Sequence, residues 1–272
     1  MPAINTNVAA LFAQQSLKVN ERNQSNAMRQ LSTGNRVNTA ADDAAGMAIG
    51  QNMTSQVRGL NQAVRNVNDG INMMQTAEGA LGETSNMLQR MRELAVQSSN
   101  GTYSTTQRSY LQTEFVALSS QIGKIASDTK WNDTNLLLTA ATTFTFQAGK
   151  DSGTTVSVTI GAMTLAGLAI DTAASVGNVT GATASLALLD SAIGTVNAQR
   201  ATIGAGINQM TYAADNLSNI AANAAASRST IMDTDYATAS TQLSKTQIIQ
   251  QAATAMLAQA NQQPQAVLSL LK

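Results

Sequence analysis

Residues 53–88 read MTSQVRGLNQAVRNVNDGINMMQTAEGALGETSNML, and their apolar residues recur at alternating steps of four and three. This spacing keeps one stripe of side chains on a single helix face, and it resumes in register at Leu81 and Leu88. Glu78 and Arg92 interrupt it. The stripe predicts a helix roughly 60 Å long at ~1.5 Å per residue, packed lengthwise against other helices. Its apolar members are Met53, Val57, Leu60, Val64, Val67, Ile71 and Met74.

Two later segments repeat the alternation and predict further long helices. The first contains Leu111, Phe115, Leu118, Ile122 and Ile125. The second, interrupted by Arg200, contains Leu186, Leu189, Ile193, Val196, Ile203, Ile207, Met210, Ala214, Leu217, Ala221 and Ala224. Residues 98–102 (Ser-Ser-Asn-Gly-Thr) predict the turn before the first of them, and Ser104 or Thr105 can cap it.

The middle of the chain has a different pattern. Residues 139–181 are rich in Thr, Gly, Ser and Val, and residues 143–147 and 155–160 alternate apolar and polar side chains on either side of a turn sequence at 148–153. We therefore expect a β-hairpin lying on the helices. Its buried side chains should be Phe144, Phe146, Val156, Val158 and Ile160.

The two ends carry helical stripes with few charges and little apolar area. The N-terminal stripe includes Ile4, Val8, Leu11 and Phe12, and the C-terminal one includes Leu243, Ile248, Ile249, Ala252, Met256, Val267, Leu270 and Leu271. Neither stabilises a helix alone, so each should pair with the other end or with copies of the chain. Pro264 predicts a kink or a helix restart. Together the patterns predict a mainly α fold of long antiparallel helices with coiled-coil packing and a small central β-hairpin region.

Composition excludes several functions. The 272 residues hold 16 Lys+Arg and 16 Asp+Glu, so the chain lacks the basic excess expected for nucleic acid or an anionic membrane surface. Without Cys or His, there is no thiol or imidazole chemistry and no His/Cys metal site. No apolar run approaches ~18 residues, and residues 1–7 lack the pattern of an ordinary signal peptide. We expect no enzyme activity, no cofactor and no metal, and neither nucleic acid nor membrane as a partner.

Several linked motifs resemble those of bacterial flagellins, the subunits of the flagellar filament. Near the N-terminus they are Leu31-Ser32-Thr33-Gly34-Asn35-Arg36-Val37-Asn38, Ala41-Asp42-Asp43-Ala44-Ala45-Gly46, Asn68-Asp69-Gly70-Ile71, Thr76-Ala77-Glu78-Gly79-Ala80-Leu81 and Leu88-Gln89-Arg90-Met91-Arg92-Glu93-Leu94-Ala95-Val96-Gln97. Near the C-terminus they are Asp233-Thr234-Asp235-Tyr236-Ala237, Ala258-Gln259-Ala260-Asn261-Gln262 and Val267-Leu268-Ser269-Leu270-Leu271. The resemblance covers about the first 140 and the last 90 residues, in order.

The resemblance implies a domain plan. Residues 1–40 and 236–272 would form the two halves of an inner coiled coil, 41–138 and 182–235 the long helices of a middle domain, and 139–181 a short hairpin insert without large outer domains. It implies self-assembly into a helical filament for swimming, export of the unfolded chain by the flagellar type III route, and an extracellular flagellum as the location. The expected partners are other copies, a flagellar export chaperone on the C-terminal segment, and the filament cap and junction proteins.

The resemblance also implies particular sites. The polymerisation core would include Ile4, Val8, Leu11, Ile249, Met256, Val267, Leu270 and Leu271. The Leu-Gln-Arg-x-Arg-Glu-Leu stretch implies binding by the vertebrate Toll-like flagellin receptor, with Arg90 and Leu94 as contacts and Glu114 on the following helix. Asp42, Asp43, Asp233 and Asp235 are expected at helix starts and not as a metal site.

Two alternatives remain at this point. A hook–filament junction protein shares such ends without forming the bulk polymer. An enzyme carried in the insert is disfavoured because the insert is only about 40 residues long and contains no catalytic constellation.

Overall fold

In the computed structural model, residues 6–138, 141–171 and 174–269 are described, with side chains given up to residue 262 in the last helix. This part contains five helices: α1 Val8–Thr33, α2 Ala44–Ser99, α3 Thr105–Asp128, α4 Val179–Met232 and α5 Tyr236–Ser269. Two small antiparallel sheets accompany them, β1 Lys130–Trp131 with β2 Thr134–Asn135 and β3 Thr142–Gln147 with β4 Thr155–Ile160. The mainly α prediction is confirmed.

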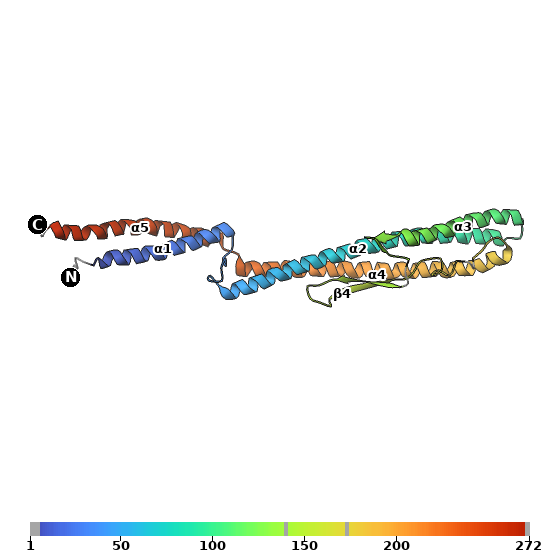
Figure 1. Cartoon of the computed structure of the whole chain (residues 1–272), viewed down its shortest axis with the longest axis horizontal. Coiled ribbons are helices and arrows are strands. Elements are labelled where there is room, and N and C mark those ends of the chain that lie inside the picture. The colour runs from blue at the N-terminus through green and yellow to red at the C-terminus, as the bar shows by residue number, and fades with distance from the viewer. Residues whose placement is uncertain (1–5, 139–140, 172–173, 270–272) are drawn as a thin grey trace. The chain divides into compact units, whose positions relative to one another are not determined.

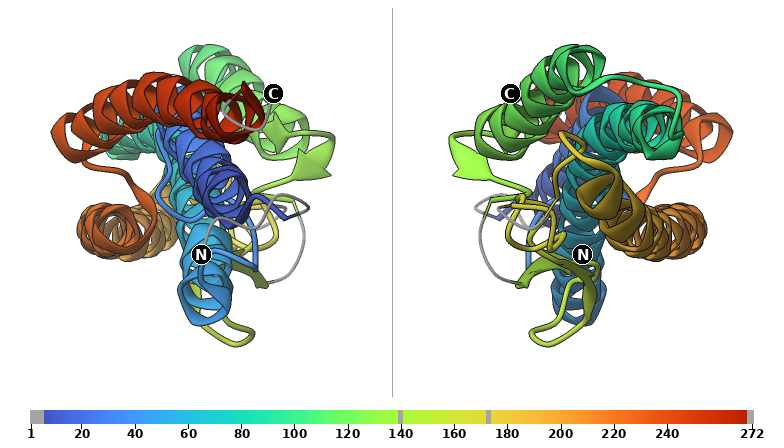
Figure 2. Two further views of the ribbon diagram at one scale, coloured as in Figure 1. Left: turned by 90° about the vertical axis from the view of Figure 1, so that its left-hand side faces the viewer. Right: turned by 90° about the vertical axis from the view of Figure 1, so that its right-hand side faces the viewer.

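The chain divides into two compact units, which we call the terminal unit (Met1–Val57 and Ala222–Lys272) and the central unit (Arg58–Ala221). The division falls inside α2 and α4. In the terminal unit, α1 and α5 lie side by side and run in opposite directions (Figures 1 and 2). In the central unit, α2, α3 and α4 enclose a shared core.

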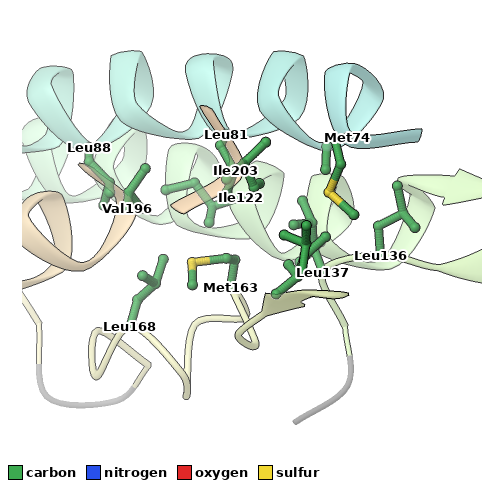
Figure 3. Packing of buried hydrophobic residues seen from close by; sticks show 14 of the residues in the cluster. Met74, Leu81, Leu88, Ile122, Leu136, Leu137, Met163, Leu168, Val196 and Ile203 are labelled. Carbon is green, nitrogen blue, oxygen red and sulfur yellow. The ribbon is translucent and has the colours of Figure 1, made fainter. Parts of the chain in front are cut away.

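The heptad stripes form the core of the central unit. Met74, Leu81 and Leu88 of α2 face Val196 and Ile203 of α4, with Ile122 of α3 beside them (Figure 3). All six side chains are completely buried. The segment after β2 (Leu136 and Leu137) and the segment after β4 (Met163 and Leu168) close one side of this core (Figure 3). Heptad spacing therefore identified the residues that hold the central unit together.

The predicted caps are present at three helix starts. Ser104 and Gln107 form a reciprocal capping box at α3, with Ser104 Oγ accepting from Gln107 N at 3.3 Å. Asp43 accepts from Gly46 N at 2.9 Å at the start of α2, and Asp235 accepts from Ala237 N at 2.9 Å at the start of α5. Asp233 differs from the expectation, since its carboxylate accepts from Ser229 Oγ at the end of α4.

The β-hairpin has the predicted strands, with Phe144 opposite Val158 and Phe146 opposite Val156. Val156, Val158 and Ile160 are buried, whereas the two phenylalanines are only half-buried. Glycines on the helices let the hairpin approach, because a Cβ at Gly70 would lie 2.9 Å from Phe146 Cδ1 and one at Gly206 would lie 2.6 Å from Val158 Cγ2.

The outer edge of β4 is held by one side chain from α4. Gln199 Nε2 donates to Thr159 O at 3.0 Å, and Gln199 Oε1 accepts from Gly161 N at 3.1 Å. The amide thus supplies the donor and the acceptor that a neighbouring strand would present.

Two helices differ from what the sequence suggested. α5 runs through Pro264 to Ser269 without a break, so the expected restart is absent. α4 meets the length and hydropathy criteria for a membrane span, the one helix of the described chain that does. These criteria are weak here, because its apolar heptad positions Leu189, Val196, Ile203 and Met210 are buried in the central core.

Candidate functional site

The seam between α1 and α5 is built from small and polar side chains. It follows a heptad on both helices, and its members are buried or half-buried. On α1 they are Ala10, Ala13, Leu17, Asn20, Gln24, Ala27 and Leu31; on α5 they are Ala239, Leu243, Thr246, Gln250, Ala253, Leu257 and Ala260. So many alanine, glutamine and asparagine positions bury little apolar area, and the pair is held weakly for its length.

Polar contacts fix the register of this seam. Asn20 Nδ2 donates to Thr246 O at 2.7 Å, and both residues are buried. Nearer the chain ends, Asn7 Nδ2 donates to Ala260 O at 2.8 Å while Asn7 Oδ1 caps α1. A buried amide in a coiled coil disfavours shifted pairings, because a shift leaves the amide without its partner.

Two of the terminal motifs meet where α1 and α4 end. Asn35 and Asp233 form an antiparallel bridge, in which Arg36 N donates to Met232 O at 2.6 Å and Thr234 N donates to Gly34 O at 2.9 Å. Gly34 has φ of +72°, which glycine adopts without strain. The motifs at residues 31–38 and 233–237 thus serve to join the two ends of the chain.

Several large apolar side chains of α1 and α5 face away from their shared seam. The exposed fractions are 70% for Phe12, 56% for Leu11 and 52% for Val8 on α1. On α5, they are 66% for both Ile248 and Met256. An apolar surface of this kind, on both helices of one pair, is typical of an interface.

Phe12 and Met256, together with Val19 (39% exposed) and Ile249 (40% exposed), define what we call the outer apolar stripe. Val19 and Ile249 line the same shallow groove between α1 and α5. Phe12 precedes Val19 by seven residues and Met256 follows Ile249 by seven, so each lies two turns farther along the same helix face. Because the helices are antiparallel, both steps lead toward the chain ends.

The predicted polymerisation residues are placed only in part. Val8, Leu11, Ile249 and Met256 are exposed on α1 and α5. Ile4, Leu270 and Leu271 lie outside the described residues, as does the side chain of Val267. Val19 is also exposed on α1 and was not among the predicted residues. The seven-residue step from Phe12 could have identified Val19.

A second group of predicted residues lies on α2 and α3 in the central unit. Arg90 Nε donates to Glu114 Oε1 at 2.9 Å, and Arg90 Nη1 donates to Glu93 Oε2 at 2.9 Å. These side chains are about half exposed, and the hydrogen bond to Glu114, followed by that to Glu93, raises the pKa of Arg90. Leu94 of the same group is 1% exposed and packs in the core, and its role as a binding contact stays a prediction.

An ion pair beside this group was not anticipated. Arg92 Nε donates to Asp190 Oδ1 at 2.6 Å and joins α2 to α4. The hydrogen bond from Arg92 lowers the pKa of the Asp190 carboxyl below its ordinary value. Within the described ranges, no three acidic, His or Cys residues gather as a metal site would require.

Comparisons with known proteins match both ends of the chain. The family model described as "Bacterial flagellin N-terminal helical region" matches residues 4–142, and the one described as "Bacterial flagellin C-terminal helical region" matches residues 186–271. Only the stretch between these matches, which holds the hairpin, is left over, so the chain is a short form without a large outer domain.

Similar proteins cover the whole length. A flagellin of Halalkalibacterium halodurans is 42% identical over 99% of both chains, and the flagellar filament 33 kDa core protein of Treponema phagedenis is 39% identical over 99% of both. The crystal structure of Bacillus cereus flagellin has a TM-score of 0.50 at 30% identity, covering 56% of this chain and 88% of that one.

Proposed function

The chain belongs to the bacterial flagellin family, and we propose that its outward apolar side chains on α1 and α5 bind neighbouring copies. As a member of this family it is a structural subunit of the extracellular flagellar filament and not an enzyme. The observation that carries this proposal is the reversal of the usual burial pattern. Alanines and amides make up most of the seam inside the pair, with leucines at four positions, while phenylalanine, valine, isoleucine and methionine remain exposed.

Burial of these exposed apolar side chains between subunits is energetically favourable. Fully burying one large aliphatic or aromatic side chain contributes about 1.5–3 kcal/mol. Phe12 and Met256, at 70% and 66% exposed, leave most of that contribution unused within one chain, and Ile249, at 40% exposed, leaves part of it unused. A helical filament repeats one heterologous contact without closing, so each subunit can bury its stripe against the next.

Elongation of short filament seeds by purified protein tests this surface. Phe12→Gln and Ile249→Gln should each raise the protein concentration needed for elongation about ten- to hundredfold, since each removes about 1.5–3 kcal/mol of apolar burial. Gln14→Ala is the matched control, because Gln14 is also exposed on α1 but is polar. Normal elongation by both glutamine variants would contradict the proposal.

We further propose that α1 and α5 become stably ordered only on assembly, as the resemblance implies for residues 1–40 and 236–272. The weak seam supports this, because ordering entropy is then offset by contacts between subunits. Amide hydrogen exchange of the unassembled chain should show much weaker protection over Val8–Thr33 than over the central part of α2. Equal protection of the two helices would contradict it.

Export of the unfolded chain by the flagellar type III route is part of the same proposal. A chain without cysteine has no disulfide to open before passing through a narrow channel. The family resemblance supplies the remaining partners: an export chaperone on the C-terminal segment, and cap and junction proteins at the filament ends. Loss of secretion in a flagellar export mutant of the source bacterium would support this route, whereas normal secretion would contradict it.

A second proposed role is binding by the vertebrate Toll-like flagellin receptor. Arg90 and Glu114 support it, because both are exposed on adjacent helices and pre-positioned by their ion pair. Arg90→Ala should weaken binding to the purified receptor ectodomain, whereas Arg65→Ala, at an exposed arginine elsewhere on α2, should leave it unchanged. Unaltered binding by the Arg90 variant would remove this site from the proposal.

The alternative of a hook–filament junction protein makes a distinct prediction. A bulk subunit should extend seeds into long filaments under electron microscopy. A junction protein should add to the seed and stop.

A further inference from the structure

Two methionines are conspicuous in the terminal unit. Met256 is 66% exposed and Met28 is 56% exposed, and they are the methionines found among the exposed large apolar side chains of the described chain. Oxidation of a thioether requires that an oxidant reach the sulfur, so exposed methionines react first. The chain contains no cysteine that would compete for the oxidant.

The two methionines differ in their position on the helix pair. Met256 belongs to the outer apolar stripe, two helical turns from Ile249 at the groove that Ile249 shares with Val19. Met28 lies nine residues beyond Val19, which is two and a half turns and therefore the opposite side of α1. They thus offer similar access to an oxidant but different surroundings.

We propose that Met256 is an oxidation site that controls whether the subunit can join a filament. This inference rests on the proposed function, because it assigns regulation to the same surface. The oxidant is a peroxide such as hydrogen peroxide. The sulfur of Met256 attacks one peroxide oxygen, the O–O bond breaks, and methionine sulfoxide and water are formed. The sulfur loses two electrons and the peroxide gains them.

The product changes the surface without disturbing the helix that carries it. A sulfoxide oxygen is a strong hydrogen-bond acceptor, and its burial in an apolar contact leaves it without a donor. In the single chain the side chain is 66% exposed, so the sulfoxide is solvated there and its formation breaks no contact of the seam between α5 and α1. Oxidation therefore lowers assembly while leaving the subunit folded.

The test combines peroxide treatment with seed elongation. Wild type, Met256→Leu and Met28→Leu are treated identically, oxidation at each methionine is measured by peptide mass spectrometry, and helix content by circular dichroism. Leucine keeps the apolar volume and cannot be oxidised. Oxidised wild type and oxidised Met28→Leu should elongate seeds at least about fivefold more slowly than their untreated forms, since burying an unpaired polar group costs about 1–3 kcal/mol. Treated Met256→Leu should elongate at its untreated rate.

Two further arms complete the test. Methionine sulfoxide reductase should restore elongation of oxidised wild type. Without peroxide, Met256→Gln should slow elongation and Met28→Gln should not, because glutamine places a polar group at the same position. Normal elongation by wild type that is fully oxidised at Met256 would overturn this inference and leave the proposed function intact. Failure of untreated wild type to elongate seeds would instead overturn the proposed function.

Discussion

Replacing Gly206 with alanine should destabilise the central unit, whereas the same replacement at Gly204, two residues earlier on α4, should stabilise it. A Cβ at Gly204 meets no atom within 4 Å. Alanine there gains about 1 kcal/mol from helix propensity alone. A Cβ at Gly206 would lie 2.6 Å from Val158 Cγ2, which real Cβ atoms essentially never do.

The collision at Gly206 is costly because Val158 cannot move aside. Valine is stiff at χ1, and Val158 is only 4% exposed beneath the hairpin. Overpacking of this kind costs about 1–3 kcal/mol, which outweighs the gain of about 1 kcal/mol in helix propensity. The two alanine variants should therefore differ by about 1–3 kcal/mol, with wild type between them.

Thermal unfolding followed by calorimetry measures the difference. For a unit of about 150–250 residues, 1 kcal/mol shifts Tm by about 2–4 °C, so Gly204→Ala should unfold higher than wild type and Gly206→Ala lower. Adding Val158→Ala to Gly206→Ala removes the methyl groups that collide. The double variant should therefore be more stable to unfolding, by about 0.5–3 kcal/mol, than the sum of the two single changes predicts. The reasoning is refuted if Gly206→Ala is as stable as Gly204→Ala.

Three further predictions follow from the polar contacts. Arg108 is buried and donates to Ser98 O and Asn100 O, both at 2.9 Å, at the end of α2. Arg108→Met should lower the free energy of unfolding in urea by about 3–6 kcal/mol, since each of the two bonds from the charged donor contributes about 1.5–3 kcal/mol. Asn20→Ala should lower the free energy of opening of the α1 amides by about 1 kcal/mol, because one buried hydrogen bond is lost. Amide hydrogen-exchange rates measure this change. Arg92 lowers the pKa of Asp190, so the pair stabilises the fold above the unfolded carboxyl pKa, and this contribution disappears as pH falls through the lower folded pKa. Asp190→Asn should consequently lower Tm slightly at pH 7 and leave it unchanged at pH 2, whereas an equal effect at both values would reject the ion pair as its cause.

Most of the fold could be predicted because its elements repeat locally. A heptad from Met53 to Leu88 specifies a long helix whatever its partner, and alternation in residues 155–160 specifies a strand with one buried face. The capping residues Asp43 and Ser104 act within three residues of themselves. Heptads, alternation and caps can be recognised in a single sequence because each depends on residues that are close together in the chain.

The candidate surface was harder to predict because α1 carries two overlapping stripes. One contains Ala10 and Leu17, the other Phe12 and Val19, and both have seven-residue spacing. Hydrophobicity alone favours the larger side chains as the internal seam, yet the structure buries the smaller ones. The choice depends on which helix lies alongside, and that helix is more than 200 residues away in the chain.

The same limitation applies to the Arg90 group. Leu94 lies one helical turn from Arg90, and the motif that contains both gives no indication that one faces water and the other the core. Asp190 is 98 residues from its partner Arg92, so the pairing depends on the register between α2 and α4.

The bidentate contact of Gln199 with β4 matters most when many copies crowd together. A bare strand edge presents a row of donors and acceptors that can recruit a strand from another molecule, and such recruitment propagates into cross-β fibrils. In a filament, many copies of this strand edge would lie close to one another. By occupying Thr159 O and Gly161 N, one glutamine side chain withholds that template. Two backbone groups at the end of β4 are thereby unable to pair with a strand of a neighbouring subunit.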